Sequence, residues 1–383
     1  MSKRVIILGS TGSIGRSTLD VLAGLGDEWE IVGLAAGSRG QELVEQANRF
    51  RPGAVAIACD GLAAEARGAL SYRPDVFAGP AALTRLVNEV EADCVVCAVV
   101  GVCGLLATLR AVELGRRIAL ANKEAMVVAG SLMIPMARRS GATIVPVDSE
   151  HSAIFQALQA GRREDVRTIY LTASGGPFRT WSVEAMEEVT LEEALRHPTW
   201  NMGPKITIDS ATMMNKALEI VEARWLFDLD CEQIDVVVHP ESIVHSMVEF
   251  NDGSIVAQLG TPDMRTPIQY ALTYPQRKPC PSPKLDLFRT GQLTFHSPDP
   301  KRFPAIRLGH EVARRGGTCG AVLNAANEAA VELFRGGAIA YRDIARFTER
   351  ALREHDFKES PTLDELLDAD RRARQEVTRC MTC

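Results

Sequence analysis

The glycine-rich segment Gly9-Ser10-Thr11-Gly12-Ser13-Ile14-Gly15 limits the possible folds of this chain more than any other feature. It follows directly on the apolar run 5–8 and opens a stretch of helical periodicity over residues 13–25. Glycines there permit a tight turn and close approach of the backbone to a ligand, and the N-terminus of the following helix favours a phosphate. The spacing, G-x-x-G-x-x-G, is one residue longer than the commonest form. We predict a dinucleotide-binding turn, with a plain strand-to-helix turn as the alternative.

The residues around this turn alternate between expected strands and helices. Apolar strands are expected at residues 5–8, 30–36, 54–57, 94–99, 117–121 and 142–147, and helices at 13–25, 41–50 and 81–89. Apolar runs that are separated by helices, and so buried on both faces, indicate a doubly wound parallel sheet. The fold class predicted is therefore α/β, with an N-terminal Rossmann-like domain over residues 1–147.

The pattern changes after residue 147. Residues 242–250 and 254–259, joined by Asn251-Asp252-Gly253, read as a β-hairpin among charged helical segments. We predict a central α+β catalytic domain over residues 148–274. A proline-rich linker over 275–304 and a C-terminal helical bundle over 305–383 complete the prediction.

Composition excludes several classes of protein. The 383 residues carry a net charge of -6, which argues against a large nucleic-acid footprint but allows a local pocket for a small phosphorylated ligand. The longest uncharged stretch, residues 94–109, is shorter than the roughly 20 residues that cross a bilayer. Nine cysteines, an odd number, fit reduced thiols, and the Cys380/Cys383 pair has no second pair nearby. We expect a cytoplasmic protein with neither a nucleic-acid nor a membrane partner.

The segment after the second expected strand bears on the choice of cofactor. An acid there would hold the ribose 2′-hydroxyl of NAD, but this chain has Gly37, Ser38 and Arg39. A hydroxyl and a guanidinium suit a 2′-phosphate, so NADP is favoured. The alternative for Arg39 is a solvated loop cation.

Two acids follow the last expected strand of the sheet. Asp148 and Glu150 are two residues apart, so in extended chain they point to the same side and can converge on one ligand. They also lie at the carboxyl edge of the parallel sheet, where such folds place their sites. The alternative is a helix beginning near His151 that Asp148 or Ser149 caps.

A second polar segment, residues 203–210, leads into a helix expected over 211–227. On that helix Asn215, Lys216 and Glu219 share one face. A surface pair of Lys216 and Glu219 is the alternative. Together with Asp148 and Glu150, Glu219 would complete an all-oxygen site suited to Mg²⁺ or Mn²⁺.

Two loops lie between these segments. Ser174, in Ala173-Ser174-Gly175-Gly176-Pro177-Phe178, can offer a hydroxyl and backbone N–H groups to a phosphate, or belong to a simple Gly-Pro loop. The segment from His197 to Gly203 carries Trp200 and Met202 on a proline-broken loop, which indicates a mobile lid. A buried corner packed by these two side chains is the alternative.

These motifs carry a specific resemblance. The sequences G-S-T-G-S-I-G, A-N-K-E (121–124), V-D-S-E, S-G-G-P-F, H-P-T-W-N-M-G, S-A-T-M-M-N-K-A-L-E and G-A-V-L-N-A-A-N-E (320–328) occur in this order. In motifs and order the chain resembles the 1-deoxy-D-xylulose-5-phosphate reductoisomerase family. The resemblance spans nearly the whole chain.

The resemblance implies roles for individual residues. The implied metal ligands are Asp148, Glu150 and Glu219, which with Lys123 and His197 make up the catalytic group. The implied phosphate contacts are Ser174, Ser210, Asn215 and Lys216, and other substrate contacts are Lys123, Ser149, Glu150, His197 and Glu219. The implied cofactor contacts are Thr11, Gly12, Ser13, Ile14, Gly37, Asn122, Glu124 and Gly203, with Ser38 and Arg39 in a loop that varies within the family. The implied lid residues are Trp200 and Met202.

The resemblance also implies a reaction. Members isomerise 1-deoxy-D-xylulose 5-phosphate and reduce the product with NADPH, giving 2-C-methyl-D-erythritol 4-phosphate for isoprenoid synthesis, and they form homodimers. A divalent metal, as Lewis acid, is then the principal catalyst. Two other hypotheses remain at this point: an NADP-dependent aldehyde dehydrogenase with Cys97 or Cys103 as nucleophile, and a non-catalytic dinucleotide-binding sensor.

Overall fold

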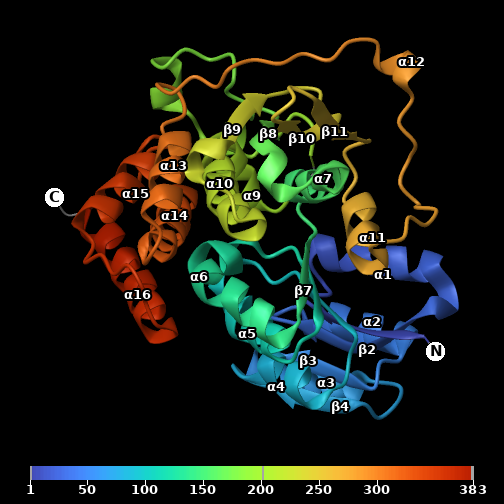
Figure 1. Ribbon diagram of the computed structural model, residues 1–383. Coiled ribbons are helices and arrows are strands. Elements are labelled where there is room, and N and C mark those ends of the chain that lie inside the picture. The colour runs from blue at the N-terminus through green and yellow to red at the C-terminus, as the bar shows by residue number, and fades with distance from the viewer. Residues whose placement is uncertain (1, 201, 381–383) are drawn as a thin grey trace. The chain divides into compact units, whose positions relative to one another are not determined.

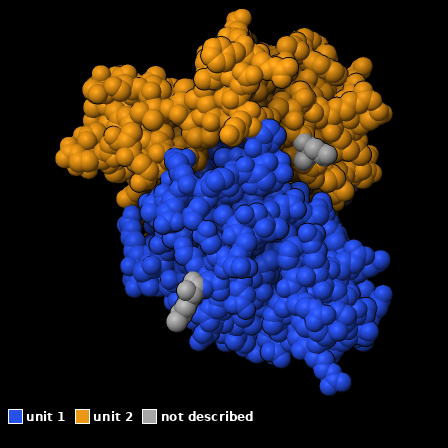
Figure 2. Space-filling model, turned by 90° about the vertical axis from the view of Figure 1, so that its right-hand side faces the viewer, with its two compact units in different colours: residues 1–125, 133–152, 263–283 blue, residues 126–132, 153–262, 284–383 orange. Residues whose placement is uncertain are grey.

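The computed structural model describes residues 2–200 and 202–380, so Cys383 of the predicted C-x-x-C pair lies outside the described residues. The chain forms two compact units, which Figure 2 shows in different colours. Unit 1 comprises residues 1–125, 133–152 and 263–283, and unit 2 comprises residues 126–132, 153–262 and 284–383. Neither unit is a continuous stretch of sequence. The division into four consecutive domains stays a prediction.

Unit 1 is built on a parallel sheet of seven strands in the order β4-β3-β2-β1-β5-β6-β7. The strands are β1 (Lys3–Leu8), β2 (Trp29–Ala36), β3 (Ala54–Ile57), β4 (Asp75–Ala78), β5 (Cys94–Cys97), β6 (Arg117–Leu120) and β7 (Thr143–Pro146). The central strands β1 and β5 are buried on both faces, as their continuous apolar runs require. The doubly wound sheet predicted from the sequence is confirmed. Strand β4 was not predicted, because it begins with an acid and lacks the continuous buried run of the central strands.

Helices flank this sheet (Figure 1). They are α1 (Ser13–Leu25), α2 (Gly40–Phe50), α3 (Ala63–Ala69), α4 (Ala82–Glu89), α5 (Leu105–Glu113) and α11 (Arg265–Thr273). Helix α11 comes from far along the chain and packs on α1, β6 and β7. Its last turn is tied to the sheet by Arg117, whose Nη1 donates to the Leu272 carbonyl oxygen at 2.9 Å.

Two helices contribute residues to both units. Helix α6 (Lys123–Ser140) has non-helical backbone at Ala129, and residues 126–132 of it count with unit 2. Helix α7 (Ser149–Ala157) begins in unit 1 and ends in unit 2. The chain therefore passes back and forth between the two units several times.

Unit 2 contains a mixed sheet in the order β11-β10-β8-β9. The strands are β8 (Val166–Ala173), β9 (Ile234–Val238), β10 (Val244–Phe250) and β11 (Ile255–Leu259). Strand β9 runs parallel to β8, and β10 is antiparallel to both β8 and β11. The predicted hairpin is thus present as β10 and β11, with β11 at the edge of the sheet.

Helices fill the rest of unit 2. They are α8 (Leu191–Ala194), α9 (Pro204–Ala211), α10 (Met214–Phe227), α12 (Leu287–Thr290), α13 (Ala305–Arg315), α14 (Cys319–Arg335), α15 (Asp343–Glu354) and α16 (Leu363–Cys380). The helical C-terminal part was predicted. The helix expected over 211–227 is present as α10, but it begins at Met214 because Met213 has φ 59° and separates it from α9. Residues 204–211 are helical too, since Gly203 caps α9 and Pro204 stands at its first turn, where a missing N–H costs nothing.

Residues of the C-terminal part of unit 2 hold α9 in place through buried polar contacts. Tyr341 donates its hydroxyl hydrogen to the Ala211 carbonyl oxygen at 2.6 Å, and Asn327 of α14 donates to Asp209 Oδ1 at 2.8 Å. Burial raises the pKa of Tyr341, so its hydroxyl stays protonated and able to donate. None of the helices in the described part of the chain combines the length and apolar character of a membrane span.

Replacing Tyr341 by Phe tests this anchor. The substitution leaves the Ala211 carbonyl buried without its partner, so we expect a loss of about 1–3 kcal/mol in free energy of unfolding. Denaturant titration measures it. Tyr72→Phe is the matched control, because Tyr72 also donates to a carbonyl, that of Pro52 at 2.8 Å, but is only half-buried. Equal losses in the two variants would contradict a special role for Tyr341.

Candidate active site

The glycine turn between β1 and α1 has no room for side chains at two positions. A Cβ on Gly9 would lie 2.6 Å from the Ala98 carbonyl oxygen, and one on Gly15 would lie 2.3 Å from the Gly9 carbonyl oxygen. Gly9 also has φ 86°. Helix α1 begins after Gly12 with no side-chain cap and no acid in its first turn. Its first N–H groups can therefore serve a phosphate, and the turn has the shape that a pyrophosphate requires.

The loop after β2 is exposed and basic. Gly37, Ser38 and Arg39 are all exposed, and the last residue of β2 is Ala36, so no acid stands at the ribose position. The Nη1 of Arg39 donates to the Thr11 carbonyl oxygen at 2.7 Å. Arg39 is thus attached to the phosphate turn, which argues against a purely solvated loop cation.

Asn122 and Glu124 stand at the start of α6. The Asn122 side chain accepts from the Ala125 N–H at 3.1 Å and so caps the helix. Its Nδ2 donates to the Gly101 carbonyl oxygen at 3.0 Å and to Glu124 Oε2 at 2.9 Å. Asn122 is buried and shapes the loop after β5, while direct contact with a cofactor stays a prediction for both residues.

Asp148 and Glu150 do not lie in extended chain. Helix α7 begins at Ser149, and Asp148 Oδ1 accepts from the N–H of Glu150 at 3.1 Å and of His151 at 3.3 Å. The predicted extended geometry is wrong because Asp148 caps this helix, the alternative considered from the sequence. The hydroxyl of Ser149 donates to Glu150 Oε2.

Asp148 is held in its charged form by two neighbours. Lys123 Nζ lies 2.7 Å from Asp148 Oδ2, and His151 Nδ1 lies 3.0 Å from Oδ1. Burial favours the neutral acid, but the Lys123 ammonium and the His151 ring outweigh it and hold the pKa of Asp148 well below its usual range. A charged carboxylate is the form that binds metal. His151 was not predicted as a partner of Asp148, although its place three residues after a helix cap was a usable signal.

Ser174 and His197 form a pair in unit 2. His197 Nδ1 accepts from the N–H groups of Thr199 at 3.1 Å and Trp200 at 2.8 Å. A neutral ring then carries its proton on Nε2, which lies 3.0 Å from Ser174 Oγ and donates to it. The same Oγ accepts from the Gly176 N–H at 3.2 Å. With two donors directed at its oxygen, the Ser174 hydroxyl can give its own hydrogen to an anion.

The loop that follows His197 is not a packed corner. Trp200 and Met202 are only partly buried, and Gly203 is exposed. The Trp200 ring lies 6.3 Å from the ring of His245, centroid to centroid. The two side chains are therefore not fully buried, and the mobile lid stays a prediction.

Lys216 and Glu219 form a buried charge pair. Their side chains are 3% and 0% exposed, so the surface pair considered as an alternative is wrong. Lys216 Nζ donates to Glu219 Oε2 and also to the Thr172 carbonyl oxygen at 2.6 Å, while Asn215 Nδ2 donates to Glu219 Oε1. A buried ion pair adds little stability compared with apolar side chains of the same size. Its presence here therefore suggests a role in binding or catalysis.

Ser210, the remaining predicted phosphate contact, is the second-last residue of α9 and is partly exposed. Its neighbour Asp209 is buried, with an oxygen 2.7 Å from Lys205 Nζ and the contact to Asn327 described above. Asp209 and Asn327 were not predicted, because their partnership joins residues far apart in sequence.

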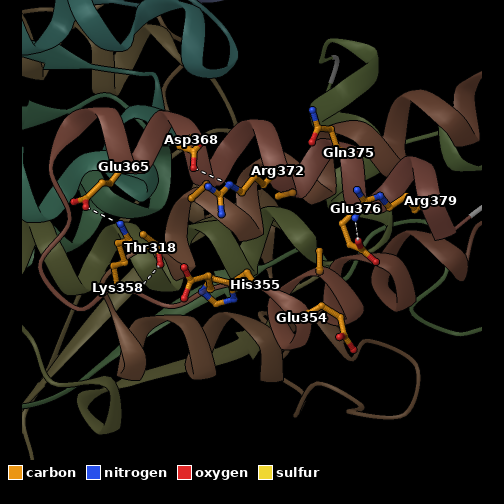
Figure 3. Close-up of a pocket in the computed structure, with 14 residues that line it drawn as sticks. Thr318, Glu354, His355, Lys358, Glu365, Asp368, Arg372, Gln375, Glu376 and Arg379 are labelled. Atoms are coloured by element: carbon orange, nitrogen blue, oxygen red, sulfur yellow. Dashed lines mark hydrogen bonds and ion pairs between the residues drawn. The ribbon is translucent and has the colours of Figure 1, made fainter.

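The cavity of Figure 3 lies elsewhere in unit 2. It has a volume of about 400 Å³ and is lined by residues of α15, α16 and the segment between them, with Thr318. Its charges largely pair with one another, as in Lys358–Glu365 and Arg372–Asp368, both at 2.7 Å. None of the predicted site residues lines it.

The cysteine-nucleophile hypothesis finds no support. Burial raises the pKa of Cys97 to about 12, which keeps this thiol protonated and unreactive. Cys103 is exposed and lies in the short 3-10 turn before α5.

The seven-stranded sheet, its glycine turn and the basic loop after β2 define a nucleotide-dependent oxidoreductase. Family models match residues 5–130, described as 1-deoxy-D-xylulose 5-phosphate reductoisomerase, and residues 144–227 and 259–376, described as C-terminal domains of the same enzyme. The chain belongs to the 1-deoxy-D-xylulose 5-phosphate reductoisomerase family.

Individual relatives agree with this assignment along the whole chain. The reductoisomerase of Pelotomaculum thermopropionicum is 50% identical over 374 residues, covering 97% of each chain. That of Chlorobium phaeobacteroides is 51% identical over 370 residues, covering 96% of each. The solved Zymomonas mobilis enzyme in complex with NADPH has a TM-score of 0.94 at 43% identity, covering 100% of this chain and 99% of that one. A reductoisomerase solved with NADPH, fosmidomycin and magnesium has a TM-score of 0.94 at 40% identity, covering 99% of this chain and 98% of that one.

Replacing Gly15 by Ala tests the glycine turn. The added methyl group meets backbone on both Gly9 and Ser10, so the turn must open, and we expect a loss of at least about 2 kcal/mol in stability together with weaker binding of dinucleotide. Chemical denaturation and NADPH fluorescence measure the two effects.

Gly24→Ala in the same helix is the matched control for that variant. A Cβ on Gly24 meets nothing within 4 Å, and Ala is the better helix former, so this variant should gain about 0.5–1 kcal/mol. Normal NADPH binding by Gly15→Ala would contradict the role given to the turn.

Proposed function

We propose that this chain converts 1-deoxy-D-xylulose 5-phosphate into 2-C-methyl-D-erythritol 4-phosphate with NADPH as reductant and Mg²⁺ or Mn²⁺ as metal. Full-length membership of the family supports the reaction, and a relative solved with NADPH, fosmidomycin and magnesium supports the cofactors. The observation that carries the proposal is the chemistry at three positions: Asp148 and Glu150 after β7 in unit 1, and the buried Glu219 of α10 in unit 2, all carry carboxylates.

These acids fit a hard divalent cation. All three offer carboxylate oxygens, the ligands that Mg²⁺ and Mn²⁺ prefer, and Asp148 is kept charged by Lys123 and His151. We propose that Asp148 and Glu150 of unit 1 and Glu219 of unit 2 bind the same cation. When bound, the cation supplies Lewis acidity to the oxygens of the substrate.

The residues around Glu219 would bind the phosphate end of the substrate. We assign this role to Ser174, Ser210, Asn215 and Lys216, with Lys123, Ser149 and His197 as further substrate contacts. The tautomer of His197 supports it, because Nε2 donates to Ser174 and so turns the serine hydroxyl into a donor for phosphate. Lys123, already beside Asp148, can stabilise negative charge that develops on a substrate oxygen.

The glycine turn and the loop after β2 would bind NADPH. The cradle at Gly9 and Gly15, which a Cβ would fill, fits the pyrophosphate. We assign Thr11, Gly12, Ser13 and Ile14 to this contact, Ser38 and Arg39 with Gly37 to the 2′-phosphate, and Asn122, Glu124 and Gly203 to further cofactor contacts. Trp200 and Met202 would close over substrate and nicotinamide and exclude water.

The metal set is tested by removing one carboxylate charge at a time. We expect Asp148→Asn, Glu150→Gln and Glu219→Gln each to lower kcat/KM by roughly a hundredfold or more, since each weakens both metal binding and charge stabilisation. The assay follows NADPH absorbance with 1-deoxy-D-xylulose 5-phosphate, and chelator should abolish turnover until Mg²⁺ is restored.

Glu249→Gln is the control for these variants. Glu249 is also a well-shielded carboxylate, 13% exposed and paired with Arg167, but it lies on β10 outside the proposed site. It should retain activity. Turnover that survives chelator, or three acid variants as active as this control, would overturn the proposed reaction.

We also propose that the protein is a cytoplasmic homodimer. The edge strand β11 leaves Ile255 54% and Leu259 38% exposed, and an apolar unpaired edge invites a second strand or sheet.

Light scattering across a range of concentrations tests the dimer. The wild-type protein should scatter as a particle with twice the mass of one chain. Ile255→Lys should shift the equilibrium toward monomer, because a charge at the contact opposes burial. Asp252→Lys, in the exposed turn between β10 and β11, is the control. A wild-type mass equal to that of one chain at all concentrations contradicts the proposal.

A further inference from the structure

Two arginines from different elements of unit 1 meet at one carbonyl group. Arg16, near the start of α1, donates from Nη1 to the Thr11 carbonyl oxygen at 2.7 Å. Arg39, in the loop after β2, donates from its own Nη1 to the same oxygen, also at 2.7 Å. Two like charges are thus brought together at the phosphate turn, of which only Arg39 was predicted to contact the cofactor.

A carboxylate joins the two guanidinium groups. Glu42 Oε1 lies 2.9 Å from Arg16 Nη1, and Glu42 Oε2 lies 3.5 Å from Arg39 Nη1. The side chains of Arg16 and Arg39 are 52% and 56% exposed, whereas that of Glu42 is 29% exposed. Glu42 is therefore less exposed than the two guanidinium groups that it contacts, and its negative charge offsets their mutual repulsion.

The position of this cluster is that of the adenosine ribose in a doubly wound fold, between the phosphate turn and the end of the second strand. A 2′-phosphate carries about -1.5 to -2 charges and three acceptor oxygens, more than the single charge of Glu42. Each guanidinium can present several N–H donors in a planar fork, and the contacts of Arg16 in the described structure use Nη1 alone. An incoming phosphate can thus replace the carboxylate and gain from both arginines.

We infer that Arg16 is a second specificity-determining residue for the 2′-phosphate of NADPH, acting with Arg39, and that Glu42 competes with that phosphate for both guanidinium groups. The inference rests on the proposed use of NADPH. Beyond that proposal, Arg16 is a new contact outside the motifs that indicated the cofactor. Glu42 is a new internal competitor, which lowers the affinity for every nucleotide with a 2′-phosphate.

Calorimetric titration of the full chain with adenosine 2′,5′-bisphosphate and with 5′-AMP tests the inference without catalysis. We expect Arg16→Ala to weaken the bisphosphate by roughly tenfold or more, as loss of a charge-assisted contact does, and to leave 5′-AMP within about twofold. Arg16→Lys, which keeps the charge, should recover part of the loss. Glu42→Gln should bind the bisphosphate several times more tightly with 5′-AMP unchanged.

Arg85→Ala is the matched control, because Arg85 makes a similar exposed pair with Glu89, at 2.9 Å, on α4. It should alter neither titration. If Arg16→Ala weakens both nucleotides equally, Arg16 only fastens the turn and the inference is wrong. It is also wrong if Arg16→Ala changes neither titration, or if Glu42→Gln weakens the bisphosphate.

The use of NADPH and the role of Arg16 are contradicted by different results of the titrations. A wild-type chain that binds 5′-AMP as tightly as the bisphosphate would overturn the NADPH assignment and this inference together. A wild-type preference for the bisphosphate that is undiminished in Arg16→Ala would overturn the inference alone.

Discussion

The buried charge pair of Lys216 and Glu219 is the constraint around which unit 2 is arranged. Two charges removed from water are costly unless further hydrogen bonds satisfy them, and here Asn215 and the Thr172 carbonyl oxygen do so. The contact to Thr172 joins α10 to the end of β8, just before the Ser174 turn. The pair therefore fixes the carboxylate proposed for metal and the hydroxyl proposed for phosphate relative to each other.

Much of the fold could be predicted from local sequence. The turn at Gly9–Gly15, helix α1 and the central strands were recognisable because glycine positions and continuous apolar runs are local signals. The break between α9 and α10 was not, since Met213 is an ordinary helix-forming residue and nothing in the local sequence marks its left-handed backbone, φ 59°. The end of β7 was misread because the same residues suit an extended strand or a capped helix.

The candidate site could be predicted as a set of residues but not as a set of contacts. Asp148, Glu150, Glu219 and Lys216 were named from spacing and resemblance, yet nothing local shows that Lys123 lies beside Asp148. The Asn327–Asp209 hydrogen bond spans 118 positions of sequence. Arg16 was passed over for the same reason, because its partners Thr11, Arg39 and Glu42 come together only when β2 and α2 are in place.

The discontinuous composition of the two units has a consequence for biosynthesis. Unit 1 includes residues 263–283, and α11 within that segment packs on α1, β6 and β7. The parallel sheet therefore emerges from the ribosome well before the helix that covers part of it. Unit 2 in turn needs residues up to α16. Unit 1 therefore stays incomplete until residues 263–283 have emerged, and unit 2 stays incomplete until its C-terminal helices have emerged, so each unit exposes unfinished surface during synthesis.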